Sequence, residues 1–285
     1  MKTSLSVLVP VYNEQHLVYP SLKRLKVLET GEDLERIQVI VVDDCSTDAT
    51  PAAIEAFRQE QTQNGDSRIE WTFLRHEKNG GKGQAVKTAL ELATCEISVI
   101  HDADLEYSPK DLLRIVSVFL HEDADVVFGS RFAGGETRRI LGYRHALGNR
   151  LLTFISNIVT NLNLTDQATC YKAVRTNLLQ SIPIESNDCR IDTELTSKLA
   201  KRQARIFEIP VSYSGRTRDE GKKINWRDGY LALAAIIKYK ISDRIYRTGA
   251  GNDVMARLSR ARKFNVWMAE LIRDYCGNRV LEIGS

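Results

Sequence analysis

The stretch QVIVVDD (Gln38–Asp44) determines the fold class of this 285-residue chain. It joins a run of aliphatic residues, Val39–Val42, to two aspartates, Asp43 and Asp44. Such a short run, rich in β-branched side chains, is typical of a strand that is buried on both faces of a parallel sheet. Carboxylates at the carboxyl end of that strand lie where open α/β sheets bind their ligands.

Strand and helix patterns alternate on both sides of this stretch. Because buried β-branched runs alternate with helical spacing, we predict an α/β fold with a mostly parallel sheet flanked by helices. The predicted strands span Leu5–Pro10, Gln38–Val42, Ile69–Leu74, Ile97–His101, Asp125–Ser130 and Arg205–Tyr213. The predicted helices span Gln15–Leu28, Thr50–Glu60, Gly81–Ala93, Pro109–Leu120, Arg144–Leu164, Ile224–Asp243 and Asp253–Cys276.

The composition is that of an ordinary globular protein, with 43% hydrophobic and 27% charged residues. The net charge of +3 is too small to argue for nucleic acid, but it suits diphosphates or acidic lipid headgroups. Five widely spaced cysteines without a CxxC motif indicate reduced thiols in a cytosolic chain. No apolar run reaches the length of a membrane span, and the N-terminal run is too short for a signal peptide.

Acidic residues follow three of the predicted strands. They lie in Tyr12–Glu14, in Asp43–Asp44 and in HDADLEY (His101–Tyr107). Asp102 and Asp104, two positions apart, can point the same way and offer the hard oxygen ligands that suit Mg²⁺ or Mn²⁺. A lone DxD is usually a solvated turn, but its convergence with two other acidic strand ends favours a functional site.

The glycine-containing segment KNGGKG (Lys78–Gly83) opens the predicted helix Gly81–Ala93. Glycines at a helix start let backbone N–H groups approach an anion, and Lys82 adds a positive charge. The segment matches neither a P-loop nor GxGxxG, so a tight turn that caps the helix remains an equal alternative.

Five segments together resemble family 2 glycosyltransferases, and most closely the branch of dolichyl-phosphate mannose synthase and related polyprenyl-phosphate sugar transferases. The resemblance covers about residues 4 to 240 and implies a GT-A-like fold. The segments are VPVYNE (Val9–Glu14), VVDDCSTDAT (Val41–Thr50), NGGKGQA (Asn79–Ala85), DADLEYSP (Asp102–Pro109) and GSR (Gly129–Arg131).

This resemblance implies a set of residues that bind a nucleotide diphosphate sugar. The later segment Glu208–Gly229 resembles a loop that folds over the diphosphate, and its phosphate ligands would include Lys223. The implied ligands of the nucleotide sugar are Pro10, Tyr12, Glu14, Val42, Asp43, Asp44, Lys82, Asp102, Ala103, Lys172, Arg216, Arg218 and Lys222.

The resemblance also implies the metal site and the reacting groups. Asp104 and Glu106 would bind Mg²⁺ or Mn²⁺, and Asp102 would face the sugar or ribose. Arg131 would reach the acceptor phosphate or the diphosphate. Asp166 would lie near the acceptor and would serve as the base if the acceptor is a hydroxyl. Asp102, Asp104, Asp166 and Arg131 are therefore the expected catalytic residues.

The chain departs from the family pattern in two places. Cys170 stands where many members have glycine, and no membrane helix accompanies the enzyme domain. The predicted helices Arg144–Leu164 and Ile224–Asp243 are amphipathic. Two interpretations stay open for them: they lie against a membrane surface, or they pack into the core.

We expect residues 1–245 to form the glycosyltransferase domain and residues 246–285 to form a linker and a helix. The terminal RVLEIGS (Arg279–Ser285) resembles the first strand and opening glycine of an S-adenosylmethionine-dependent methyltransferase. A truncated fusion would explain this tail.

The expected function is metal-dependent, inverting transfer of a sugar from a GDP- or UDP-linked donor to an acceptor. The resemblance implies a polyprenyl (dolichyl-type) phosphate as acceptor and a role in cell envelope glycan biosynthesis. We expect a cytoplasmic protein without a nucleic-acid partner; peripheral contact with the cytoplasmic membrane face and homo-oligomerisation stay open. The alternatives are a nucleotidyltransferase that makes nucleotide sugars and a non-catalytic nucleotide-sugar-binding scaffold.

Overall fold

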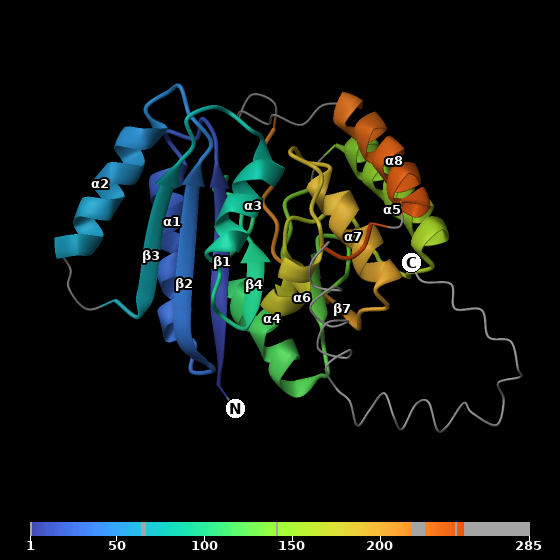
Figure 1. Cartoon of the computed structure of the whole chain (residues 1–285), viewed down its shortest axis with the longest axis horizontal. Helices are drawn as coiled ribbons and strands as arrows, with labels where there is room; N and C mark the ends of the chain where they lie inside the picture. The colour runs from blue at the N-terminus through green and yellow to red at the C-terminus, as the bar shows by residue number, and fades with distance from the viewer. Residues whose placement is uncertain (1, 64–66, 141, 218–225, 243, 248–285) are drawn as a thin grey trace, which may run out of the picture. The chain divides into compact units, whose positions relative to one another are not determined.

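The computed structural model describes residues 2–63, 67–140, 142–217, 226–242 and 244–247. Strands and helices alternate along most of this range (Figure 1). The strands are β1 (Thr3–Val11), β2 (Leu34–Asp43), β3 (Ile69–Arg75), β4 (Ile97–Ile100), β5 (Val126–Ser130), β6 (Lys172–Arg175) and β7 (Ile206–Pro210). The helices are α1 (Val18–Leu25), η1 (Lys26–Thr30, a 3₁₀ helix), α2 (Thr50–Gln63), α3 (Lys82–Glu91), α4 (Lys110–His121), α5 (Tyr143–Thr160), α6 (Thr176–Ser181), α7 (Ile191–Lys201) and α8 (Trp226–Ile241).

The strands form one seven-stranded sheet in the order β3-β2-β1-β4-β6-β5-β7. All neighbouring strands are parallel except at β6, which runs antiparallel to both β4 and β5. The predicted α/β fold with a mostly parallel sheet is therefore confirmed.

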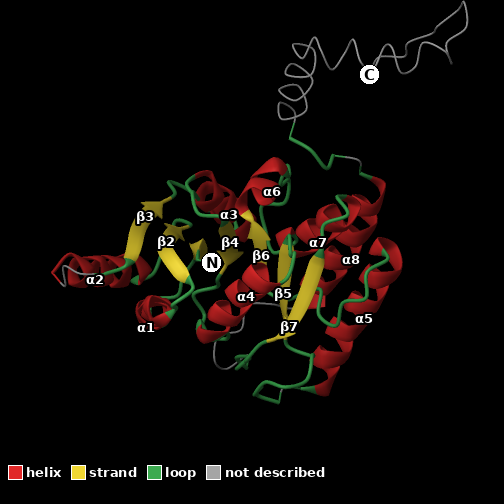
Figure 2. Ribbon diagram, turned by 90° about the horizontal axis from the view of Figure 1, so that it is seen from below, coloured by secondary structure: helices red, strands yellow, loops and turns green. Residues whose placement is uncertain are grey.

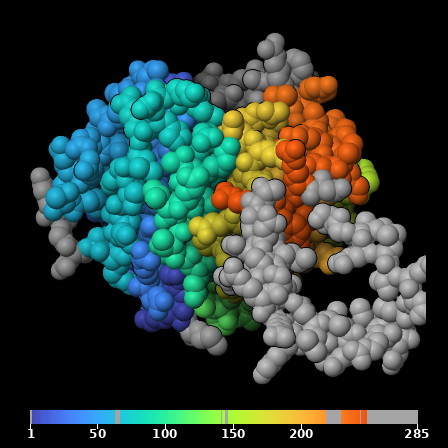
Figure 3. All heavy atoms as spheres, viewed as in Figure 1, coloured from blue at the N-terminus to red at the C-terminus, as the bar shows by residue number. Residues whose placement is uncertain are grey.

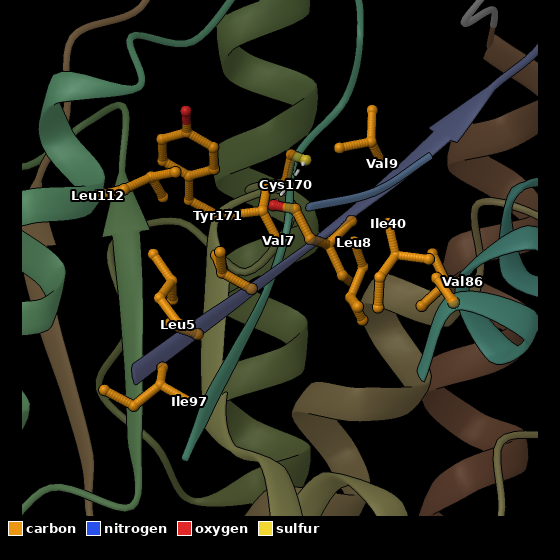
Figure 4. Packing of buried hydrophobic residues seen from close by; sticks show 14 of the residues in the cluster. Leu5, Val7, Leu8, Val9, Ile40, Val86, Ile97, Leu112, Cys170 and Tyr171 are labelled. Atoms are coloured by element: carbon orange, nitrogen blue, oxygen red, sulfur yellow. Dashed lines mark hydrogen bonds between the residues drawn. The ribbon is translucent and has the colours of Figure 1, made fainter. Parts of the chain in front are cut away.

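Strand β1 lies inside the sheet and is buried along most of its length. Successive side chains of a strand point to opposite faces, so both faces of β1 need apolar cover. In Figure 4, Leu8 lies toward Ile40 and Val86, whereas Val7 lies on the side of Tyr171. This two-sided burial explains why β1 is apolar from Val7 to Val11.

Helices cover both faces of the sheet. Figure 2 shows α1 and α4 on one face and α3, α6 and α7 on the other. Helices α5 and α8 lie side by side near the β5 and β7 end of the sheet, and the orange atoms of α8 reach the molecular surface in Figure 3. None of the helices in the described ranges is long and apolar enough to span a membrane.

The parallel register brings the acidic strand ends to one edge of the sheet. Val11 pairs with Asp43 across β1 and β2, and Leu8 pairs with Ile100 across β1 and β4. The segments that follow these strands therefore leave the sheet side by side, and this edge carries the candidate site.

Some predicted elements differ from the structure. Strand β6 and helices α6 and α7 were not predicted, and the predicted strand Arg205–Tyr213 is shorter, as β7. The predicted helix Gln15–Leu28 begins only at Val18 and passes into a 3₁₀ helix. One compact unit runs to Ile245; the predicted helix Asp253–Cys276 and the methyltransferase-like tail lie outside the described residues.

Candidate active site

The loop after β1 is held by the loop after β2. The backbone N–H of Asn13 donates to Ser46 Oγ (2.9 Å), and that of Glu14 donates to Thr50 Oγ1 (2.8 Å). In return, the N–H of Thr47 donates to Asn13 Oδ1 (2.8 Å). The small hydroxyl residues of CSTDAT thus fix the Tyr12–Glu14 segment at the sheet edge.

Each acidic strand end contains a residue in the left-handed backbone region. These residues are Asn13 (φ 50°), Cys45 (φ 60°) and Leu105 (φ 62°). Asparagine tolerates this conformation, but for cysteine and leucine it is uncommon and costs free energy. Strain of this kind persists where the surrounding structure imposes it, and such places are often functional.

Asp44 anchors the glycine turn that precedes α3. Its Oδ1 accepts from the N–H of Gly80 (2.9 Å) and lies 2.7 Å from His76 Nδ1. Its Oδ2 accepts from the N–H of Gly81 (2.6 Å). These contacts give the buried carboxylate a positioning role, and its predicted contact with the nucleoside stays a prediction.

Asp43 is also buried and serves the same two loops. Its Oδ1 accepts from the N–H of Ser46 (3.0 Å), and Arg75 Nε lies 3.3 Å from its Oδ2. Since Arg75 is the last residue of β3, Asp43 links the ends of two neighbouring strands. Its predicted contact with the nucleoside stays a prediction.

Lys82, the first residue of α3, lies between two carboxylates. Its Nζ is 2.9 Å from Asp102 Oδ2 and 3.4 Å from Asp192 Oδ2. Burial alone would lower the pKa of Lys82, but the two carboxylates outweigh it and raise that pKa well above its usual value. The charge of Lys82 is matched by these protein groups, and its predicted contact with the nucleotide sugar stays a prediction.

The same contact acts on Asp102. Burial alone would raise the pKa of the Asp102 carboxyl, but the ammonium group of Lys82 outweighs it and holds that pKa below its usual value. Asp102 therefore stays ionised at the sheet edge. Asp192 lies in the first turn of α7 and was not predicted as a site residue.

Three carboxylates from two strand ends surround the guanidinium group of Arg216. Its Nη1 is 3.3 Å from Glu14, its Nη2 is 3.4 Å from Asp104 and its Nε is 3.6 Å from Glu106. Arg216 was predicted to bind the diphosphate. In the structure it instead neutralises the acidic residues that were predicted to bind the nucleotide and the metal.

Glu106 fastens the segment that carries Arg216. Its carboxylate accepts from Tyr213 Oη (2.7 Å) and from the backbone N–H of Arg216 (2.8 Å). Its carbonyl oxygen accepts from the N–H of Ser214 (2.8 Å). The predicted metal ligand is thus engaged in holding residues 213–216 over the site.

Asp104 is the acidic residue that most needs a cation. Its burial, together with the negative charges of Asp102 and Glu106, raises the pKa of Asp104 to about 7. Over the described ranges, no three acidic, histidine or cysteine side chains already form a metal cage. The donor set still fits Mg²⁺ or Mn²⁺, because a partly buried group of carboxylates offers hard oxygens, and the single charge of Arg216 is shared among three of them.

Arg131 and Asp166 form a buried ion pair with two parallel hydrogen bonds. Arg131 Nε donates to Asp166 Oδ2 (2.6 Å) and Nη2 donates to Oδ1 (2.8 Å). The backbone N–H of Arg131 adds a third bond (3.1 Å). The two side chains are thus engaged with each other, and the predicted roles of Arg131 toward the acceptor and of Asp166 near it stay predictions.

Lys172 is a core residue. Its side chain is fully buried, and its Nζ donates to the carbonyl oxygens of Gln167 (2.8 Å) and Thr169 (2.6 Å). Burial lowers its pKa. The ammonium group thus fixes the segment before β6, and the predicted contact of Lys172 with the nucleotide sugar stays a prediction.

The other predicted ligands differ in exposure. Val42 and Ala103 are buried, Pro10 is half-buried, and Tyr12 is 39% exposed at the sheet edge. The predictions for Arg218, Lys222 and Lys223 lie outside the described residues.

A basic group that was not predicted surrounds the ring of Phe132. The guanidinium carbons of Arg131, Arg138 and Arg150 lie 5.6, 6.0 and 5.9 Å from the ring centre. Arg138 and Arg150 are exposed, unlike Arg131. A cation over an aromatic face is a favourable arrangement, so Phe132 gathers exposed positive charge beside the buried ion pair.

Curated proteins similar to this chain include two sugar transferases. The chain is 23% identical over 219 residues to dolichol-phosphate mannosyltransferase of Pyrococcus furiosus, covering 76% of this chain and 58% of that protein. It is 24% identical over 215 residues to UDP-N-acetylglucosamine--dolichyl-phosphate N-acetylglucosaminyltransferase of Methanococcus voltae, covering 72% and 83%. An uncharacterized protein of Methanocaldococcus jannaschii is 26% identical over 245 residues, covering 84% and 93%.

Solved structures support the fold. Glucosyl-3-phosphoglycerate synthase from Mycobacterium tuberculosis, crystallised with Mn²⁺, UDP and glucosyl-3-phosphoglycerate, superposes with a TM-score of 0.62 at 17% identity. The match covers 83% of this chain and 80% of that one. The GT-A-like architecture expected from the resemblance is thereby confirmed.

The family assignment follows from a family sequence model whose match covers most strands of the sheet. The model of glycosyl transferase family 2 matches residues 6–182, more than half of the chain. This range contains all three acidic strand ends, the α3 turn and the Arg131–Asp166 pair. The chain is therefore a glycosyltransferase and belongs to family 2.

Proposed function

We propose that this enzyme transfers a sugar, with inversion, from a GDP- or UDP-linked donor to a polyprenyl phosphate. The observation that carries the proposal is the convergence of Glu14, Asp104 and Glu106 around one cation, Arg216. Such an acidic site at the carboxyl edge of the sheet suits a metal-bound diphosphate. The names of the two dolichyl-phosphate sugar transferases support the class of acceptor.

Asp104 and Glu106 would hold Mg²⁺ or Mn²⁺. When bound, the ion would neutralise negative charge on the departing nucleoside diphosphate. Arg216, which lies beside both carboxylates, would bind the diphosphate. Arginine suits this role, because its planar group makes paired hydrogen bonds to phosphate oxygens.

The pairing of Asp166 favours an anionic acceptor over a hydroxyl. A hydroxyl needs a base, but both oxygens of Asp166 accept hydrogen bonds from Arg131. A phosphate acceptor is already ionised near neutral pH and needs positioning instead. Arg138 and Arg150, exposed beside Phe132, are suited to hold it and replace Arg131 in the role predicted for that residue.

The lipid part of the acceptor would lie along α5. This helix exposes an apolar stripe at helical spacing and contains no Asp or Glu. Such a composition suits an anionic membrane surface, with the enzyme bound peripherally. The stripe, defined here as the α5 stripe, consists of Tyr143, Leu147, Leu151, Phe154 and Ile158.

A two-step experiment tests the proposal. First, a thermal-shift screen with Mn²⁺ compares GDP- and UDP-linked sugars, and we expect one of them to stabilise the protein. The stabilising donor, labelled in its sugar, is then incubated with polyprenyl phosphate, and label should appear in the lipid fraction. Asp104→Ala should lose this transfer, whereas Asp33→Ala, at an exposed position away from the site, should keep it.

Two results would contradict the proposal. Donor binding without transfer to any polyprenyl phosphate would favour a nucleotide-sugar-binding scaffold. Full transfer by Asp104→Ala would exclude the metal site at Asp104.

A further inference from the structure

Four buried or half-buried charges of alternating sign run from the core to the candidate site. Lys172 Nζ lies 3.9 Å from Asp192 Oδ1, Asp192 Oδ2 lies 3.4 Å from Lys82 Nζ, and Lys82 Nζ lies 2.9 Å from Asp102 Oδ2. We call this series the charge ladder. Its members come from β6, α7, α3 and the segment after β4, so it joins four separate parts of the fold.

Asp192 is the central acidic residue of the ladder and has no role in the proposed function. Its side chain is 15% exposed, and its Oδ1 is buried without a hydrogen-bond partner among the described residues. A buried carboxylate oxygen without a hydrogen-bond partner costs folding free energy, so the presence of Asp192 at this position calls for an explanation. Its neighbours on both sides are lysines, and one of them contacts the DxD motif directly.

The frame around Lys82 is rigid at both ends. The backbone N–H of Gln84 in α3 donates to the carbonyl oxygen of Asn187 (3.2 Å), and Lys87 Nζ donates to Asn187 Oδ1 (2.6 Å). On the α7 side, the buried Glu194 accepts from the N–H groups of Glu185 and Ser186, both at 2.7 Å. The starts of α3 and α7 are therefore locked together independently of Lys82.

Within this frame, two carboxylates determine where the ammonium group lies. Lysine has a flexible four-carbon stem, so a single partner would leave Lys82 Nζ free to follow Asp102. A second carboxylate, that of Asp192, fixes the ammonium group, and through it the carboxylate of Asp102. We propose that Asp192 is a positioning residue of the donor site, which fixes Asp102 through Lys82. This inference rests on the proposed function, in which Asp102 faces the donor sugar or ribose.

The test compares four variants of the full chain with the wild type. They are Asp192→Asn, Lys82→Met, the double variant and the matched control Asp188→Asn. The control removes the same charge just before α7, where Asp188 contacts the exposed Arg190 instead of Lys82. Transfer kinetics gives kcat and the donor KM, and urea unfolding gives the stability of each variant.

We expect Asp192→Asn to lower kcat by about tenfold or more, with a donor KM within about threefold of the wild type, because a misplaced group costs rate more than binding. Asp188→Asn should keep both constants. Lys82→Met should be less stable than the double variant, because it leaves two uncompensated carboxylates, Asp102 and Asp192. The double variant should regain stability without regaining kcat.

Two results would overturn the inference. If kcat returns together with stability in the double variant, Lys82 and Asp192 only neutralise each other. If Asp192→Asn transfers sugar like the wild type, Asp102 needs no such support. The urea series uses no substrate, so an absence of coupling between Lys82 and Asp192 there also overturns the ladder, even if the wild type transfers no sugar and the proposed function itself fails.

Discussion

At the scale of single residues, each aspartate of the DxD motif has its own protein cation. Lys82 contacts Asp102, and Arg216 contacts Asp104. Lys82 belongs to the locked start of α3, whereas Arg216 lies on the segment after β7 that Glu106 holds. The two aspartates therefore pair with cations from different parts of the fold.

Asp104→Asn should make stability less sensitive to pH. The folded-state pKa of Asp104, about 7, lies above its usual value of 3.8, so the folded protein retains a proton that the unfolded chain has released. The stability from this group is complete below about pH 4 and is lost as pH rises through 7. From pH 5.5 to 8, urea unfolding should show a larger loss of stability in the wild type than in Asp104→Asn.

Mn²⁺ should offset this loss, because it replaces the proton on Asp104. Its stabilising effect on the wild type should be larger at pH 8 than at pH 5.5 and absent in Asp104→Asn. Asp33→Asn, at an exposed position, serves as the control and should behave like the wild type. If the free energy of unfolding depends on pH in the same way for the wild type and Asp104→Asn, the raised pKa of Asp104 would be contradicted.

Asp166→Asn should destabilise the fold by about 3 kcal/mol or more, because it leaves the charge of the mostly buried Arg131 without its partner. As a control, Glu70→Gln removes an exposed pair with Arg36 and should change stability by about 1 kcal/mol or less. Urea unfolding measures both. An Asp166→Asn variant with wild-type stability and no transfer would restore the role of Asp166 as a base.

At the scale of elements, the start of α3 depends on close backbone contact. A Cβ atom at Gly83 would collide with the carbonyl oxygen of Ser186, and one at Gly81 would collide with that of Asn187. Gly81 also has a φ of 89°, which other residues rarely adopt. The segment is therefore a packed joint between α3 and the segment before α7, and the cap and turn interpretation of KNGGKG is the one that these contacts favour.

Gly83→Ala should destabilise the protein by about 1–3 kcal/mol, because the clash is with backbone that must shift. Gly148→Ala, inside α5, is the matched substitution. No atom lies within 4 Å of a Cβ there, so the change should stabilise the protein by about 0.5–1 kcal/mol through helix propensity. Thermal unfolding distinguishes the two, and equal effects would contradict the packing argument.

The sequence predicted the sheet and its acidic edge because both follow from local pattern. Apolar runs identify buried strands, and parallel order brings their ends together, as Val11 and Asp43 show. Helix α7 was missed although Ile191, Leu195 and Leu199 follow helical spacing, and with it Asp192 was missed as well. That spacing could have revealed the helix.

The partners of the charged residues could not be predicted. Sequence gives the type of a side chain but not its neighbours, so Lys172 was predicted as a ligand although its buried Nζ bonds to the carbonyl oxygens of Gln167 and Thr169 and lies 3.9 Å from Asp192. Arg131 and Asp166 were assigned separate roles because their pairing depends on a contact between residues 35 positions apart. Such contacts depend on the folded backbone.

At the scale of the whole molecule, the α5 stripe is apolar surface that packing into the core does not explain. Its side chains are all exposed, Phe154 to 62%. Contiguous exposed apolar surface of this kind usually marks an interaction site. Arg138 and Arg150 near its start add the positive charge that an anionic lipid surface attracts.

Replacing Leu151 and Phe154 with serine should lower binding to anionic vesicles by about tenfold or more, because each buried large side chain contributes about 1.5–3 kcal/mol. Leu92→Ser, at a residue 41% exposed elsewhere on the surface, should bind like the wild type. Vesicle sedimentation measures the partition. Equal binding of all three proteins, or no dependence on anionic lipid, would contradict membrane docking through the α5 stripe.

The antiparallel strand β6 has a consequence for how this enzyme can diversify. It returns the chain to the middle of the sheet, beside β5, so residues 131–171 leave and re-enter the sheet at adjacent strands. This excursion carries Phe132, its exposed arginines and all of α5, whereas Glu14, Asp44 and Asp104 precede it in the chain. If the proposed function holds, a graft that exchanges this excursion as a cassette would redirect the enzyme to another recipient of the sugar while leaving Glu14, Asp44 and Asp104 in place.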